Sequence, residues 1–212
     1  MNVRDDPSKL SALSPGTAIY PKGRQKLQDI LTTASEVLAY DGYSAFTMRN
    51  IASKLGITLR NLQYYFPTKR DLFLAVVEQM TDMELGTAKA AVDLPNMTAE
   101  ERFAAFIEYS VHDNETPFVR GFQFELWALA TRDEFAAECR DRMTSAYCDY
   151  IYTLVKPLTP GLSPKEQRGK SALILAMLQG TPLVHSPGVE KRYQIKDIAA
   201  KINREALAIL AS

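Results

Sequence analysis

The sequence predicts an all-α protein. Apolar residues recur at spacings of three and four through most of the 212-residue chain, which is the period of an amphipathic helix. Two of these segments open with a Ser or Thr followed three residues later by a Glu, a pattern that caps helix N-termini. No segment alternates apolar and polar residues as a half-buried strand does, and the chain has no internal repeat.

The composition is that of a folded protein. A hydrophobic content of 46% in 212 residues is enough for the core of one or two compact domains. No run of eighteen apolar residues is present, and the opening MNVRDDPSKL carries acids instead of an apolar stretch. We therefore expect no membrane partner and a cytoplasmic location. Residues 1–21 contain three prolines without apolar periodicity, which predicts a flexible arm.

The first predicted helix begins near Lys22. Its apolar positions Leu27, Ile30, Leu31, Ala34 and Leu38 lie at helical spacing, and Asp41-Gly42 supplies the stop after about five turns.

The segment 46–70 predicts a helix-turn-helix. Ile51 and Leu55 in one short helix, and Ile57 and Leu62 in or before the next, are spaced to share a small core. Gly56 lies where the first helix must end with a positive φ, which glycine adopts without a Cβ penalty. Thr47 and Thr58 can cap the two helices. The alternative, an ordinary corner between two helices, explains fewer of these positions.

The second of these helices presents polar and aromatic side chains that its core does not need, a set suited to the major groove of DNA. The flanking charge agrees, because 22–70 holds eight basic and three acidic residues, whereas 71–212 holds fifteen basic and twenty acidic ones. We expect double-stranded DNA as a partner. The candidate contacts are Lys22, Arg24, Thr47, Arg49, Thr58, Leu59, Arg60, Asn61, Gln63, Tyr64, Tyr65 and Lys69.

Residues 34–76 resemble the N-terminal DNA-binding domain of the TetR/AcrR family of transcriptional regulators. The matching stretches are Asp41-Gly42-Tyr43, 47–52, Leu55-Gly56-Ile57, Tyr65-Phe66-Pro67 and 68–72. Gln63 departs from the family pattern, which has a phosphate-contacting tyrosine directly after the leucine of the recognition helix. The resemblance implies a DNA-binding domain over 22–70 and a helical regulatory domain over 71–212. It also implies a repressor that binds a palindromic operator and is released by a small, mostly apolar effector.

The remaining chain continues as helices. Thr68 opens a long helix that ends before Leu94-Pro95-Asn96, and Thr98-x-x-Glu101 is a capping box. Ser163-Pro164-x-Glu166 opens a helix whose centre, 172–178, is apolar on all sides. Burial on all sides favours a second copy of the chain, which would form a four-helix bundle, over the core of a monomer. The residues expected at this interface are Leu173, Ile174, Met177, Leu178, Ile195, Ile198, Ile202 and Ile209.

The resemblance also implies an effector pocket in the helical domain, where most aromatic side chains form the core and a few polar groups orient the ligand. The candidate lining residues are Met80, Met83, Phe106, Tyr109, His112, Phe122, Glu125, Trp127, Tyr147 and Met177.

Enzyme chemistry is not expected. The chain has two histidines, no Cys-x-x-Cys, no Gly-x-Ser-x-Gly and no glycine-rich phosphate loop, so we assign no catalytic residue, metal ligand or cofactor. Two alternatives remain open. One is a thiol- or metal-sensing regulator that uses Cys139 and Cys148, and the other is an interaction module without an effector.

Overall fold

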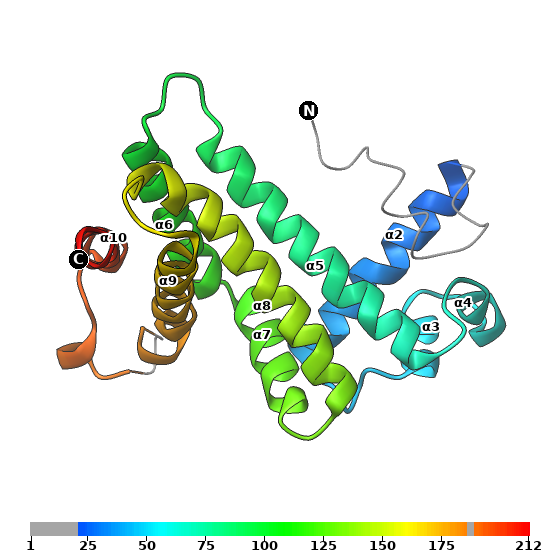
Figure 1. The fold of residues 1–212 in the computed structure, drawn as a ribbon. Helices are drawn as coiled ribbons and strands as arrows, with labels where there is room; N and C mark the ends of the chain where they lie inside the picture. The colour runs from blue at the N-terminus through cyan, green and yellow to red at the C-terminus, as the bar shows by residue number, and fades with distance from the viewer. Residues whose placement is uncertain (1–20, 186–188) are drawn as a thin grey trace. The chain divides into compact units, whose positions relative to one another are not determined.

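The computed structural model describes residues 21–185 and 189–212, and in these residues it contains helices and no strand, as predicted (Figure 1). Within the same residues, no helix has the length and apolar character needed to cross a membrane. The predicted arm lies outside the described residues except for Pro21. The principal helices are α2 (Pro21–Glu36), α3 (Met48–Lys54), α4 (Leu59–Tyr65), α5 (Lys69–Val92), α6 (Ala99–Glu115), α7 (Pro117–Ala130), α8 (Glu134–Val155), α9 (Pro164–Val184) and α10 (Ile198–Ala211).

The chain divides into two compact units. Among the described residues, unit 1 consists of 21–83 and Gly121–Arg140, and unit 2 consists of Glu84–Arg120 and Asp141–Ser212. The expected boundary at residue 70 therefore does not coincide with a boundary between the units. Contacts over long sequence separations explain the difference, since they bring most of α7 and the first part of α8 into unit 1.

The first predicted helix has two parts. α2 buries Leu27, Ile30, Leu31 and Ala34, and the chain then continues as a π-helix, Val37–Asp41, instead of a regular α-helix. Gly42 ends it with φ of 79°, so the predicted stop is confirmed. No feature of the apolar pattern had indicated the π-helical turn.

The helix-turn-helix is confirmed, and Figure 1 shows α3 and α4 as two short helices just before α5. The Thr47 hydroxyl accepts a hydrogen bond from the backbone N–H of Asn50 at 3.2 Å, and Thr58 does the same for Asn61 at 3.1 Å. Gly56, between the helices, has φ of 62°. Each cap contributes about 1 kcal/mol, so the turn is defined from both sides.

Unit 2 is built around α6, which packs against both α9 and α10. Its core contains Phe103 and Ile107 of α6, Ile174 and Leu178 of α9, and Leu210 of α10. Both predicted capping boxes are present, at Thr98–Glu101 and Ser163–Glu166.

The residues expected at a dimer interface fall into two groups. Ile174 and Leu178 are at most 2% exposed and Ile198 is also buried, because α6 and the other core helices of unit 2 cover them. These three are core residues of a single chain, which corrects their assignment to an interface. Leu173 is 56% exposed on the other side of α9. Met177, Ile202 and Ile209 are partly buried, and Ile195 is exposed but precedes α10 instead of lying in it.

Candidate functional site

The most exposed polar surface of unit 1 that the sequence singled out lies on α4. Arg60, Asn61 and Gln63 are exposed, and Tyr64 is 68% exposed, whereas Leu62 is completely buried beneath them. Tyr65 packs edge to face on Tyr64, with ring centroids 5.5 Å apart. A helix with one buried apolar position and a row of exposed donors, acceptors and rings has the composition that reads base edges in a major groove.

The other candidate DNA contacts surround this helix in sequence. Lys22, Arg24, Arg49 and the two capping threonines are exposed, and Leu59 is partly buried. Lys69 differs, because its ammonium lies 3.7 Å from the centroid of the Tyr43 ring, a cation–π contact. Burial lowers the pKa of the Lys69 ammonium and raises that of the Tyr43 hydroxyl.

The loop that precedes α3 is supported by α7. Glu125 accepts a hydrogen bond from the backbone N–H of Tyr43 at 3.0 Å. Gly121, one turn earlier on α7, approaches the end of the π-helix so closely that a Cβ there would lie 2.2 Å from the carbonyl oxygen of Ala39. On the far side of this loop, Lys54 of α3 forms an ion pair with Asp41 at 3.0 Å. The Glu125 side chain and the close approach of Gly121 therefore hold the segment that leads into the helix-turn-helix against α7 within unit 1.

Comparison with known proteins identifies this arrangement. The model of the family of bacterial regulatory proteins called tetR matches residues 30–76, which include α3 and α4. An uncharacterized helix-turn-helix transcriptional regulator from Xanthobacter autotrophicus is 27% identical over 75% of this chain and 79% of its own length. Residues 30–76 are thus a DNA-binding segment of the type found in the TetR family of transcriptional regulators. The chain is a DNA-binding transcriptional regulator and not an enzyme.

Other comparisons agree with this assignment. The regulator RutR of Escherichia coli K12 is 35% identical over 65 residues, which cover 31% of each chain. Among solved structures, a TetR regulator from Legionella pneumophila has a TM-score of 0.64 at 16% identity and covers 85% of this chain and 94% of its own. A regulator from Saccharomonospora viridis, solved in complex with choline, has a TM-score of 0.61 at 19% identity, with coverages of 89% and 96%.

Half of the candidate effector residues of this chain lie in unit 1. Met80 and Phe122 are at most 1% exposed and belong to its core, Met83 is 49% exposed, and Trp127 is partly buried beside Phe124. The Glu125 carboxylate accepts a hydrogen bond from the backbone N–H of Tyr43. Glu125 therefore has a structural role in unit 1, and its assignment as an effector contact stays a prediction.

The other five candidates lie in unit 2. Phe106 is buried and packs edge to face on Tyr150, Met177 is partly buried on α9, and His112 is exposed. Tyr109 and Tyr147 are brought together with acidic side chains in a partly buried polar cluster. The Tyr147 hydroxyl donates a hydrogen bond to Glu84 Oε2, and Tyr109 is hydrogen bonded to Asp113 and Thr87.

Glu84, which is 7% exposed, was not among the residues expected at a site. Burial raises the pKa of its carboxyl to about 8, and the like charge of Asp113 acts in the same direction although the Tyr147 hydrogen bond opposes both. The position of Glu84 in the apolar pattern of α5 could have indicated that it is buried. Glu84 continues the buried side of α5 that Val77, Met80, Thr81 and Ala88 define at spacings of three and four.

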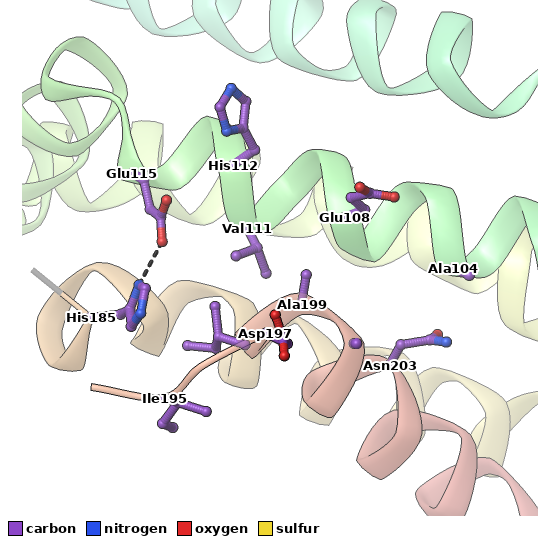
Figure 2. A pocket seen from close by; sticks show the side chains of 12 residues that line it. Ala104, Glu108, Val111, His112, Glu115, His185, Ile195, Asp197, Ala199 and Asn203 are labelled. Carbon is purple, nitrogen blue, oxygen red and sulfur yellow. Dashed lines mark hydrogen bonds and ion pairs between the residues drawn. The ribbon is translucent and has the colours of Figure 1, made fainter. Parts of the chain in front are cut away.

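Unit 2 also has an open groove of about 570 Å³ between α6, the end of α9 and the start of α10 (Figure 2). Figure 2 shows Glu115 of α6 paired with His185, which follows α9; their Oε1 and Nδ1 atoms are 2.6 Å apart. Asp197, which precedes α10, has φ of 55°. Val111, Ile195 and Ile198, with three alanines, supply the apolar part of the lining.

The two cysteines lie in different units, Cys139 buried in unit 1 and Cys148 partly buried in unit 2. Burial raises the pKa of the Cys148 thiol, which lowers the fraction of the thiolate, the form that reacts with oxidants and metals. Among the described residues, no group of three or more His, Cys, Asp or Glu is placed to hold a metal ion.

Proposed function

We propose that this transcriptional regulator is a repressor that binds a palindromic operator as a homodimer and leaves it when a small effector binds. The observation that carries the proposal is the capped helix α4 with its exposed Arg60, Asn61 and Gln63. One helix of seven residues reads few base pairs, so two copies at a fixed separation are needed for a specific site. Residues 22–70 would supply the DNA contacts and 71–212 the regulation.

The homodimer proposal is supported by apolar exposure on α9. Leu173, Leu183 and Val184 are each more than half exposed although they lie in one helix. Exposed large apolar side chains that cluster on one element are typical of interaction surfaces. A palindromic operator is two-fold symmetric, so we expect this surface of α9 to pack against α9 of a second copy of the chain.

The effector proposal is supported by the chemistry of unit 2 and by a structural relative. The Saccharomonospora viridis regulator of the same fold carries bound choline, so this fold accommodates small molecules. Unit 2 combines aromatic side chains with a few buried polar groups, which is the usual lining of a small-molecule site. We place the protein in the cytoplasm, since its operator would be on the chromosome.

The test is selection of duplexes from a random DNA pool by the full-length protein, followed by measurement of its mass in solution. Recovery of an inverted repeat by a dimer supports the proposal. Recovery of no preferred sequence at moderate salt would overturn operator binding, and a monomer on an asymmetric site would overturn the symmetry. Repression is tested separately by placing the recovered site between a promoter and a reporter gene.

A further inference from the structure

One carboxylate oxygen in unit 2 lacks a partner. Glu84 Oε2 accepts the hydrogen bond of the Tyr147 hydroxyl, but Glu84 Oε1 is buried and has no hydrogen-bond partner. A buried acceptor without a donor costs about 1–3 kcal/mol, and more when it is charged. Proteins keep such a group where a ligand supplies the missing partner, or where strain or chemistry needs it.

The side chains around Glu84 indicate the charge of that ligand. Asp113 is partly buried, and it acts on Glu84 as a like charge. Tyr109 is hydrogen bonded to Asp113, and Tyr147 to Glu84, so each acid has a phenol beside it. Lys89, one turn beyond Glu84 on α5, lies over the Tyr150 ring, with its ammonium 5.4 Å from the ring centroid. The cluster thus combines two acids and two phenols.

Glu84 is also next to apolar surface. Tyr109, Tyr147 and Leu85 pack against the core of unit 2, in which Phe106 and Tyr150 are in edge-to-face contact. Aromatic faces attract cations and also pack against hydrocarbon. A ligand with a cationic end at Glu84 and an apolar body would therefore use both parts of this region.

We propose that Glu84, with Tyr109, Asp113 and Tyr147, binds a small organic cation that carries N–H donors, such as a protonated primary amine or an amidinium. The cation would bind the ionised form of Glu84 and displace the proton that burial favours in the free protein. One N–H would then satisfy Glu84 Oε1, and the positive charge would offset the two acids. An anion would be repelled, and a neutral ligand without a donor would leave the oxygen unpaired. The inference rests on the proposed function and deepens it, because it makes the cationic end of the effector the part that is recognised.

The experiment uses the full chain and four probes built on one ring: benzylamine, benzamidine, benzyl alcohol and benzoate. Isothermal titration calorimetry measures binding to the wild type, to Glu84→Gln and to Glu108→Gln. Glu84→Gln keeps the shape and the acceptor for Tyr147 but removes the charge, whereas Glu108 is an exposed acid on α6 and serves as the matched control. Circular dichroism establishes that each variant is folded, and Asp113→Asn is the second variant should Glu84→Gln fail to fold.

We expect at least one cationic probe to bind the wild type and the neutral and anionic probes to bind at least about tenfold more weakly, the value of one charge-assisted hydrogen bond. Glu84→Gln should lose about tenfold or more in affinity for the cation, and Glu108→Gln should lose none. The inference is overturned by cationic probes that do not bind at millimolar concentration, by equal binding of benzyl alcohol, or by unchanged affinity in Glu84→Gln.

A DNA-binding assay on the selected operator separates this inference from the proposed function. If an amine binds through Glu84 but operator affinity is unchanged, the proposal of effector release is contradicted and the proposal of a cation site is supported. If no amine binds and another class of molecule releases the operator, the proposed function is supported and the proposal of a cation site is contradicted.

Discussion

The carboxylate of Glu125 on α7 accepts the backbone N–H of Tyr43, 82 residues earlier in the chain, at 3.0 Å. Tyr43 lies in the turn between Gly42, which ends the π-helix, and α3, which opens the helix-turn-helix. The same tyrosine ring carries the Lys69 ammonium on its face. Tyr43 therefore connects two helices. Its backbone N–H binds Glu125 of α7, and its ring contacts Lys69 at the start of α5.

Replacing Glu125 by alanine is expected to destabilise unit 1. The Tyr43 N–H would lose its acceptor in a partly buried position, at a cost of about 1–3 kcal/mol. The free energy of unfolding in urea measures the loss. Glu138→Ala, an exposed acid on α8 in the same unit, is the control and should change stability by no more than about 0.5 kcal/mol. Equal stability of the two variants would contradict a supporting role for Glu125.

Gly121→Ala is expected to disrupt the contact between α7 and the π-helix. The new Cβ would lie 2.2 Å from the Ala39 carbonyl oxygen, which is backbone and cannot move aside cheaply, so we expect a loss of about 2 kcal/mol or more. Gly169→Ala is the matched control, because that helical glycine has open space around it. It should gain up to about 1 kcal/mol from helix propensity. Opposite shifts in the thermal midpoint of the two variants are the expected result.

Arg60→Ala is expected to relax the base preference of the protein. If Arg60 makes a bidentate contact with a base, its loss reduces discrimination at that position by about 1–3 kcal/mol. Binding to a panel of operators with single base changes measures the effect. Arg204→Ala, an exposed arginine on α10, should leave the panel unchanged. A uniform loss over all operators would instead assign Arg60 to the phosphate backbone.

The free energy of unfolding should fall as the pH rises from 4.5 to about 8, the two limits that Glu84 sets. Its carboxyl pKa is about 8 in the folded chain against an ordinary value of 4.5, so between these pH values the folded state holds a proton that the unfolded state has released. Stability is therefore greatest below pH 4.5 for this group and is lost toward pH 8, by on the order of 5 kcal/mol at most. The raised pKa of Asp113 acts in the same direction.

Glu84→Gln is the test of this pH dependence. Thermal midpoints at pH 5.5 and 8.5 should differ less in the variant than in the wild type, and the variant should be the more stable protein at pH 8.5. Wild-type and variant curves of equal slope would show that Glu84 does not hold a proton in the folded chain.

Local signals in the sequence were enough for the helix-turn-helix and the capping boxes, because the residues that make each cap lie three positions apart. The structural role of Glu125 went unpredicted for the opposite reason, since its partner is 82 residues away and a single acid on an aromatic-rich helix gives no indication of it. The apolar centre of α9 correctly indicated burial, but periodicity could not separate Ile174, which faces its own core, from the exposed Leu173. Glu84 could have been found from its register on α5.

The two-segment composition of unit 1 has a consequence for how the protein is made. Phe73 of α5 contacts Phe135 of α8, with ring centroids 6.4 Å apart, and the backbone N–H of Tyr43 donates a hydrogen bond to Glu125 of α7. A ribosome that has synthesised the chain only through α5 has therefore not yet produced the residues that cover this face. The DNA-binding portion would reach its final packing only after residue 140 has emerged, and a fragment cut at residue 83 would expose that face to water.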